Sequence, residues 1–277
     1  MLKQRIITAL MLMALLVGTL CVASDWPFSA FGLVLIVAAA WEWGRLNAAK
    51  AVSPALAVVL AAAGAAAFAL GWDRAAPGLL WWSALLLWAL GGAWVLRAGV
   101  SAWSSHAAPL RWLLGVVLLA LAWLAIVNAR AVGVNFLLSI CCVVWMADIA
   151  AYFGGRAWGR RKLAPAISPG KSWEGVWSGM IGVLVLAGVW LAVDRSFQFD
   201  SPSLFTHLRT RLGLPGMVLV VLFLAALSVV GDLFESLVKR SAGVKESSNL
   251  LPGHGGVLDR FDALLPVLPV ALAFASL

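Results

Sequence analysis

Three short polar segments carry almost all of the chemistry that this sequence could perform. The most specific is the run 252–262, where glycines surround His254 and the spacing Asp259-Arg260-x-Asp262 follows. Glycine lets the backbone turn tightly and expose its N–H groups, a geometry that suits anions. A functional role for His254 is therefore favoured over simple loop chemistry. The glycines of this run are Gly253, Gly255 and Gly256.

The second polar segment, 231–240, continues directly from an apolar run. Asp232, Ser236 and Lys239 are spaced i, i+4 and i+7, so a helix would place them on one face. A carboxylate, a hydroxyl and an ammonium at a membrane boundary are the groups that a metal–phosphate site needs. The alternative is a solvated helix end. Arg240 follows at once, and Lys245 and Glu246 come shortly after.

The third segment begins with Asp148, the one charge in the apolar run 140–151. A carboxylate in the middle of a membrane helix costs about 2.5–3.5 kcal/mol, so Asp148 is expected to face a polar cavity or a cation. Beyond it lies a basic loop rich in glycine, which suits a polyanion; plain positive charge beside anionic lipid is the alternative. Gly170-Lys171-Ser172 is not a P-loop, because Pro165 stands where that motif needs glycine. The candidate binding residues here are Ser168, Lys171 and Glu174.

The elements that position these segments are predicted to be membrane helices. Of the 277 residues, 63% are hydrophobic and 12% are charged, and the mean hydropathy is +0.99, which excludes an ordinary soluble domain. The net charge of +8 reflects basic cytoplasmic loops, and no nucleic-acid-binding signature is present, so nucleic acid is not an expected partner.

The hydropathy pattern predicts an all-α, polytopic membrane helix bundle of about nine transmembrane helices. One integral membrane domain, 1–277, is the simplest organisation, with 1–130 mainly scaffold and 145–265 holding the catalytic groups. A cleaved signal peptide is the alternative for the first apolar run. The predicted spans are 6–23, 28–44, 53–71, 79–96, 112–127, 133–153, 175–193, 216–235 and 262–276.

Lys and Arg indicate the orientation of these spans. With nine spans, only Arg74, Arg130, Arg195, Arg209 and Arg211 fall on one side of the membrane, and the rest of the 20 Lys and Arg fall on the other. Cytoplasmic loops carry the excess of positive charge. The N-terminus and the polar loops are therefore predicted to be cytoplasmic, in a multi-pass protein of the cell inner membrane.

At this level of detail the polar segments resemble a known family. Ser236-x-x-Lys239-Arg240, then Lys245-Glu246, then the run from Pro252 to Asp262, is similar to the signature of phosphatidate cytidylyltransferases. Asp148-x-x-x-Tyr152, Ser168-Pro169-x-Lys171-x-x-Glu174-Gly175 and the run 40–44 also fit that family. The sequence departs from it at Glu246, where the family usually has Asp, at Gly170, where a basic residue is common, and at Ser172, where Thr is usual.

The resemblance implies the reaction of CTP with phosphatidate to give CDP-diacylglycerol and pyrophosphate, with Mg²⁺ as cofactor and no protein nucleophile. It implies Asp232 and Asp259 as the metal ligands. The implied catalytic residues are Asp148, Lys239, Arg240, Lys245, His254, Arg260 and Asp262. The implied substrate-binding residues are Ser168, Lys171, Glu174, Ser236, Gly253, Gly255 and Gly256.

Two other functions and one question of assembly stay open at this stage. A CTP-dependent kinase of a lipid alcohol would transfer the γ-phosphate instead. A transporter could line its pathway with Asp148 and Glu42. Against the transporter, the charges gather in loops and not along a path across the membrane. A homodimer is compatible with the sequence.

Overall fold

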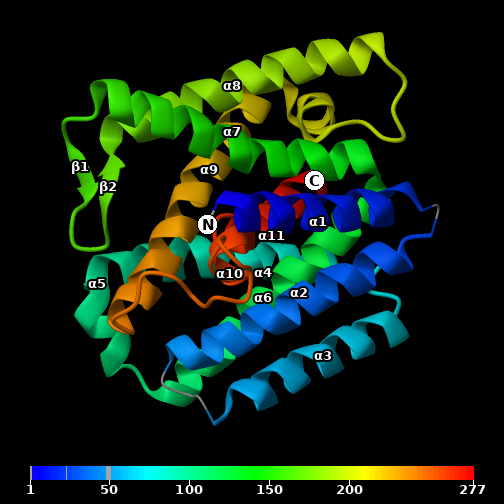
Figure 1. The fold of residues 1–277 in the computed structure, drawn as a ribbon. Coiled ribbons are helices and arrows are strands. Elements are labelled where there is room, and N and C mark those ends of the chain that lie inside the picture. The colour runs from blue at the N-terminus through cyan, green and yellow to red at the C-terminus, as the bar shows by residue number, and fades with distance from the viewer. Residues whose placement is uncertain (1, 23, 48–50) are drawn as a thin grey trace.

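The computed structural model describes residues 2–22, 24–47 and 51–277, with side chains described from residue 6 onward. Lys3, Arg5 and Lys50, which entered the count of basic residues, therefore lie outside the described side chains. The described chain is mostly helical (Figure 1). Its helices are α1 (Leu2–Cys21), α2 (Trp26–Leu46), α3 (Ser53–Ala69), α4 (Gly78–Leu86), the π-helix η1 (Leu87–Gly92), α5 (Ala93–Ser105), α6 (Ala108–Val132), α7 (Val134–Trp158), α8 (Trp173–Ser196), α9 (Leu204–Ser241), α10 (Leu258–Phe261) and α11 (Leu264–Ala275).

The prediction of a multi-pass helical membrane protein is confirmed at the level of architecture. In the described residues, six helical segments are long and apolar enough to cross a membrane, and two shorter apolar helices cover 6–21 and 53–69. Each of the nine predicted runs overlaps a helical segment, but the predicted number of nine transmembrane helices is not confirmed. The six segments are α2, the continuous stretch Gly78–Ser105, α6, α7, α8 and α9.

Two features were absent from the predicted all-α fold. The strands β1 (Lys162–Ala164) and β2 (Ser168–Ser172) form a small antiparallel hairpin between α7 and α8. In addition, the stretch Gly78–Ser105 bends at Gly99, whose φ of 82° is readily adopted only by glycine. Short polar strands and single bends leave almost no trace in a hydropathy pattern, which explains why they were missed.

The helices α7 and α8 pack closely because small residues line their interface. A Cβ atom at Gly154 would lie 1.9 Å from Oγ of Ser178, and one at Gly182 would lie 2.6 Å from Cβ of Ala150. No larger side chain fits between these helices. The β1–β2 hairpin is thereby held at one end of the pair, where Ser172 accepts a hydrogen bond from the Gly175 N–H and caps α8.

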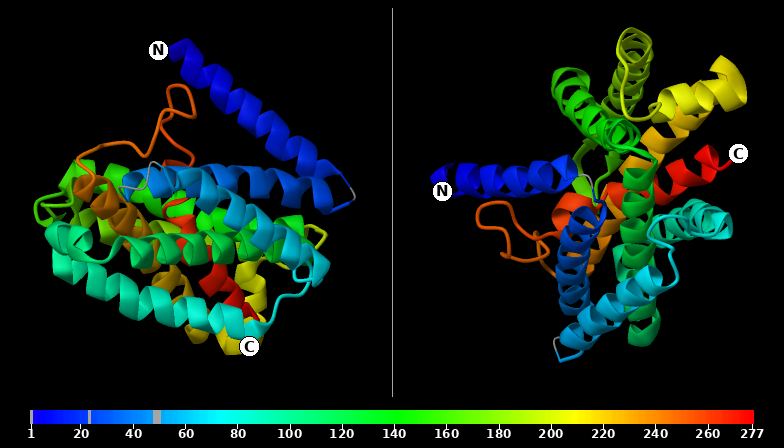
Figure 2. Two further views of the ribbon diagram at one scale, coloured as in Figure 1. Left: turned by 90° about the horizontal axis from the view of Figure 1, so that it is seen from below. Right: turned by 90° about the vertical axis from the view of Figure 1, so that its right-hand side faces the viewer.

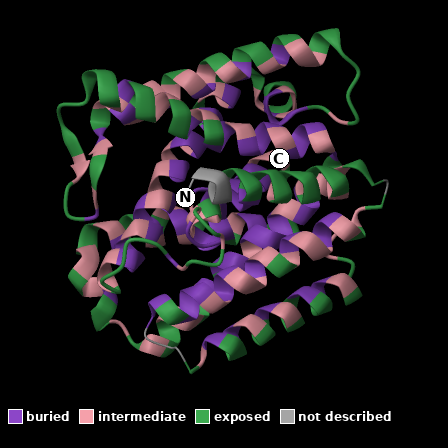
Figure 3. Cartoon of the chain, in the orientation of Figure 1, coloured by how far each residue is buried: buried purple, intermediate pink, exposed green. Residues whose placement is uncertain are grey.

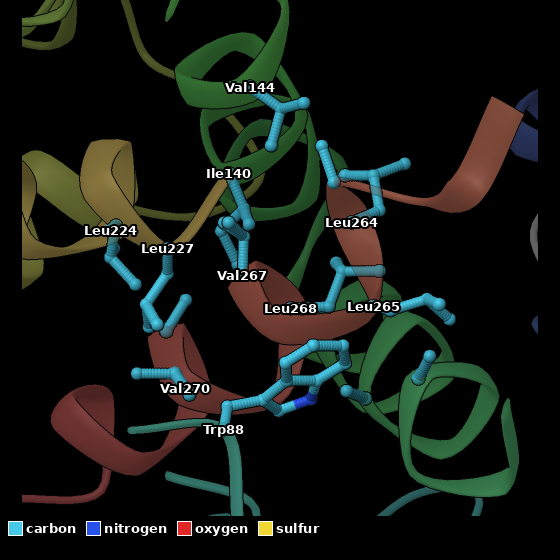
Figure 4. Packing of buried hydrophobic residues seen from close by; sticks show 14 of the residues in the cluster. Trp88, Ile140, Val144, Leu224, Leu227, Leu264, Leu265, Val267, Leu268 and Val270 are labelled. Carbon is cyan, nitrogen blue, oxygen red and sulfur yellow. The ribbon is translucent and has the colours of Figure 1, made fainter. Parts of the chain in front are cut away.

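The centre of the bundle is α11, whose residues from Leu264 to Ala273 are buried. A helix that is apolar on all sides belongs in a core. In Figure 4 its side chains pack against Ile140 and Val144 of α7, Leu224 and Leu227 of α9, and Trp88. This core fixes α9 relative to α7, and therefore fixes the polar groups that these two helices carry.

The first helix stands apart from the bundle. In Figure 2 α1 projects away from the other helices, and in Figure 3 most of it is exposed. Its exposed side chains are apolar, with Ile7 64% and Leu10 63% exposed, as expected for a surface that lies against lipid. A hydrogen bond from Thr8 Oγ1 to the carbonyl oxygen of Pro252 links α1 to the glycine-rich segment 252–256.

Candidate active site

A cleft of about 490 Å³ opens between α7, α8, α9 and strand β2. Asp148 of α7, Lys171 of β2 and Asp232 of α9 all line it. Three residues that are far apart in the sequence thus share one cavity. The hairpin that carries Lys171 lies between α7 and α8 at one end of the bundle (Figure 1). Apolar side chains, among them Met180 and Val229, also line the cavity. The cleft therefore has both charged and apolar lining.

The charged lining is organised by an ion pair between Lys171 and Asp232. Nζ of Lys171 lies 2.6 Å from Oδ2 of Asp232, and both side chains are about one-quarter exposed, at 24% and 28%. Oγ of Ser236 donates a longer hydrogen bond, 3.3 Å, to Oδ1 of Asp232. The ammonium and the carboxylate are therefore accessible to a ligand in the cleft. Ser168, which the sequence predicted to bind substrate, and Arg156, which belongs to the basic loop, line the same space.

Glu174 holds the hairpin that presents Lys171. Its Oε2 accepts the backbone N–H groups of Arg160 and Arg161, each at 3.1 Å, and its Oε1 accepts Nε of Arg161. These bonds tie the first turn of α8 to the chain that enters β1. Glu174, predicted to bind substrate, makes its described contacts within the protein, and we interpret it as a positioning residue.

Lys239 lies in a buried cluster with two carboxylates. Its ammonium pairs with Glu235, one turn earlier on α9, and donates a 2.6 Å hydrogen bond to Oδ1 of Asp259. Glu235 is 1% exposed, and a buried carboxylate of this kind needs a cation beside it. Sequence reasoning missed Glu235, although its i, i+4 spacing with Lys239 was a signal. Lys239 thus joins α9 to the segment that follows the glycine-rich turn.

Asp259 accepts several hydrogen bonds that hold together the segment around the glycine-rich turn. Its Oδ2 accepts the backbone N–H of Gly256 at 2.8 Å, and both the N–H and the hydroxyl of Ser247 at 3.0 and 2.9 Å. Burial alone would raise the pKa of Asp259, but the hydrogen bonds from Lys239, Gly256 and Ser247 outweigh it and lower the pKa to about 2. Asp259 is therefore an ionised and rigidly oriented carboxylate.

Glu42 of α2 anchors the same segment from the other side and is fully buried. It accepts the backbone N–H groups of Val257 and Leu258 at 2.9 and 2.7 Å, and the hydroxyls of Ser247 and Ser248. All of these donors lie in the segment 242–258, which connects α9 to α10 and is called the polar loop below. Glu42 therefore serves to position this loop. This is not the arrangement that a transport pathway lined by Glu42 would need.

The glycines of this turn have distinct structural roles. Gly253 and Gly255 adopt φ of 78° and 83°, which favour glycine. A Cβ atom at Gly256 would lie 1.9 Å from Oγ of Ser247 and 2.5 Å from Oε1 of Glu42. Gly256 is thus required for the close approach of the loop to α2.

The remaining predicted residues divide between the loop and its surroundings. Nη2 of Arg260 donates to the carbonyl oxygen of His254 at 2.7 Å, and Arg240 bonds the carbonyl oxygens of Val244 and Ile167. Arg240 therefore links α9 to the hairpin. Lys245 is exposed and lines a separate, open surface hollow with Arg45 and Glu246.

Asp262, at the entry to α11, lies beside the cleft. Its Oδ1 accepts the backbone N–H of Ala263 at 2.7 Å. Its charge also interacts with those of Asp232, Lys239 and Asp148. The structure thus brings Asp148, Lys171, Asp232 and Asp262 together.

The whole chain matches one protein family. The model described as the cytidylyltransferase family covers residues 3–277. The chain belongs to this family. It is 39% identical over 99% of its length to the phosphatidate cytidylyltransferase of Pseudomonas aeruginosa, 96% of which is covered. The phosphatidate cytidylyltransferase of Haemophilus influenzae is 46% identical to this chain over a region that covers 50% of this chain and 44% of that protein. The phosphatidate cytidylyltransferase of Bacillus subtilis is 41% identical over a region that covers 51% of this chain and 48% of that protein.

Family membership gives the site its chemical class. A cytidylyltransferase is a nucleotidyltransferase, so the chain is an enzyme that handles a nucleoside triphosphate. The cations around the cleft match the charge of such a substrate. The apolar helices make it an enzyme of the membrane.

Proposed function

We propose that the chain transfers the CMP group of CTP to phosphatidate, giving CDP-diacylglycerol and pyrophosphate for phospholipid biosynthesis. The observation that carries this proposal is the mixed lining of the cleft. Its cationic side chains, with Lys171 and Arg156, suit phosphate groups, and its apolar side chains, with Met180 and Val229, suit the lipid part of phosphatidate. The name of the Pseudomonas aeruginosa relative supports the same substrate.

The bond changes are those of a direct displacement. An oxygen of the lipid phosphate forms a bond to the α-phosphorus of CTP, and the bond from that phosphorus to the oxygen leading to the β-phosphate breaks. Pyrophosphate leaves with the bonding electrons. A phosphate monoester is largely ionised at pH 7, because its second pKa is about 6, so no general base has to activate it. The work left for the protein is to bring two polyanions together and hold them in line.

We assign this work to the cationic side chains around the cleft. Lys171, presented by the hairpin that Glu174 holds, is placed to bind a phosphate oxygen, and Arg156 is placed to bind a second. Arg260 and His254 belong to the glycine-rich turn and are proposed to contact the nucleotide phosphates. Lys239 keeps the carboxylates of Glu235 and Asp259 in place.

The carboxylates fit the magnesium ion that the family resemblance implies. Asp232 and Asp259 each pair with an ammonium 2.6 Å away, from Lys171 and Lys239, so a lysine now stands beside each carboxylate where a bound cation would take its place. Asp259 is also fixed by backbone donors, as ligating carboxylates usually are. Mg²⁺ needs only one or two carboxylates beside phosphate oxygens and water. We therefore propose Asp232 and Asp259 as its ligands; the bound ion would neutralise phosphate charge.

We further propose that all nine apolar segments are membrane-embedded and that the cleft faces the cytoplasm of a bacterial inner membrane. The β1–β2 hairpin, the end of α2 and the end of α9 lie at the same end of the bundle (Figure 1). These elements carry many of the basic residues, which supports a cytoplasmic location for that end. CTP would then have direct access to the cleft.

The choice of acceptor tests this proposal. The purified protein in detergent should release pyrophosphate from CTP when phosphatidate is present and should not do so with diacylglycerol, which lacks the attacking phosphate. Appearance of a phosphorylated lipid from diacylglycerol would favour the lipid-alcohol kinase. Failure with phosphatidate, by protein that elutes as a single folded species, would contradict the proposed reaction.

A further inference from the structure

A second cavity, of about 210 Å³, lies on the opposite side of α9 from the cleft. Its walls come from η1 with the start of α5 and from α6, and Phe234 of α9 also lines it. Asp232, only two residues before Phe234, lines the cleft. The two cavities thus flank the same turn of α9 without sharing a lining residue.

This cavity opens onto the apolar outer surface of the bundle. Two of its lining residues are largely exposed, Trp94 at 57% and Leu110 at 58%. Leu90 of η1 and Leu113 of α6 are also exposed, at 69% and 61%. In a multi-pass membrane protein such leucines face lipid. A cavity that opens on such a surface would admit a hydrocarbon chain from the side.

Two buried polar atoms belong to residues that line this otherwise apolar space. Within the described part of the chain, Nε1 of Trp88 and Nε of Arg111 have no hydrogen-bond partner, and Trp88 is only 2% exposed. A buried donor without an acceptor is costly. Arg111 stands near the start of α6, with its Nη1 3.4 Å from Oδ1 of Asn47. An acceptor oxygen supplied by a ligand would satisfy such donors.

The backbone around the cavity is irregular in a way that creates its space. The segment Leu87–Gly92 is a π-helix, a form that often marks functional sites. Gly91 and Gly92 contribute no side chain to fill the cavity. After the bend at Gly99, Trp103 and His106 complete its lining.

We propose that this cavity binds one acyl chain of an anionic phospholipid of the bilayer, with the headgroup phosphate at Arg111. The cavity is smaller than a pocket for a whole drug-sized ligand, but it suits a single chain segment. Arginine binds phosphate oxygens strongly, and basic pockets between membrane helices on the cytoplasmic side accept anionic headgroups. The bound chain packs against Phe234, on the face of α9 away from the substrate cleft.

A photoactivatable phosphatidylglycerol with a diazirine in its acyl chain tests this site. This lipid has no phosphate monoester, so it is not an acceptor in the proposed reaction and reports on this cavity separately. In nanodiscs of phosphatidylcholine, irradiation should place the probe on peptides from residues 87–118. Unlabelled phosphatidylglycerol should compete, and the same amount of added phosphatidylcholine should not. Both lipids carry a phosphodiester and only phosphatidylglycerol has a net negative charge, so equal competition by both would overturn the assignment of an anionic headgroup to Arg111.

Gly91→Leu provides a second measurement. A Cβ atom at Gly91 meets only Cδ1 of Leu87, at 3.7 Å, so the larger side chain is tolerated and fills the cavity. The variant should lose most of the label on 87–118. Gly188→Leu is the matched control, because a Cβ atom there meets nothing within 4 Å, and its labelling should equal that of the unchanged protein. Undiminished labelling of a folded Gly91→Leu variant would refute the site.

Discussion

Replacing Glu42 by Gln should detach the polar loop from α2 while leaving the helix bundle folded. The carboxylate accepts two backbone N–H groups and two hydroxyls. In glutamine one of the two oxygens becomes an NH₂ group, which faces one of those backbone N–H groups without being able to accept from it. The substitution changes shape very little, so its effect reports on hydrogen bonding and charge.

The magnitude follows from these contacts. One stranded backbone donor costs about 1–3 kcal/mol, and the two bonds to the oxygen that is kept lose about 1 kcal/mol each when their acceptor becomes neutral. The hydroxyl beside the new NH₂ group can turn to accept from it, so it adds no cost here. The total is about 3–5 kcal/mol against the attached position of the loop. Since 1.36 kcal/mol corresponds to a factor of ten, kcat/KM should fall by about a hundredfold or more. Asp259 and Arg260 follow the loop directly, which explains why activity suffers.

The assay combines kinetics with hydrogen exchange. The amides of Val257 and Leu258 should exchange faster in Glu42→Gln, together with the drop in kcat/KM. Asp194→Asn is the matched control, because Asp194 also accepts bonds from Ser203, Thr206 and Asn135, but at the opposite end of α8 from the hairpin. It should lower Tm without changing kcat/KM of the folded protein. Wild-type kinetics in Glu42→Gln would refute the anchoring role.

Three further predictions follow from the site and the topology. Asp232→Asn and Asp259→Asn should stay folded in detergent yet lose at least about a thousandfold in turnover, and excess Mg²⁺ should not fully restore it. Glu246→Asp should remain active. Near-normal turnover of either Asn variant would remove that residue from the metal site. Gly256→Ala should lose activity because its Cβ atom collides with Ser247. Gly188→Ala, whose Cβ atom meets nothing within 4 Å and which does not line the cleft, should behave as wild type; equal activities would contradict the packing of the loop. The topology is tested with single cysteines in a protein whose own cysteines have been replaced. Cysteines at 160 and 245 should react with a membrane-impermeant thiol reagent only after the cytoplasmic face is opened, whereas a cysteine at 74 should react in intact cells. Labelling of position 245 from outside would reverse the orientation.

The sequence was sufficient to predict the membrane-helical architecture and the enzyme family. Apolar runs are a strong signal because a bilayer requires about 20 apolar residues for each crossing. The segments around Asp148, Lys171 and Asp232 were also predicted, because charges and glycines are conspicuous in such an apolar chain. Their meeting in one cleft could not be read from spacing alone, since it depends on the close packing of α7 and α8 at Gly154 and Gly182.

Positioning residues were the hardest to predict. Glu42 lies some 200 positions before the loop that it anchors, and no local pattern connects the two. Lys239 shares an i, i+7 spacing with Asp232, but its ammonium pairs with Glu235 and Asp259. Spacing on a helix predicts the face of a side chain only coarsely, and a long lysine turns toward the nearest buried carboxylates. The hydrogen bonds that Glu174 accepts from the backbone of Arg160 and Arg161 are likewise invisible in the sequence, and its contact with substrate stays a prediction.

The central claim, that the cleft transfers a nucleotidyl group to a lipid phosphate, is tested most directly by isotope position. Purified protein should be given phosphatidate with CTP labelled either at the α-phosphorus or at the γ-phosphorus. The account predicts that the extracted lipid carries the α-label only, that the γ-label leaves as pyrophosphate, and that Asp232→Asn abolishes both signals. Lipid marked by the γ-label would contradict the account, because the protein would then be a kinase.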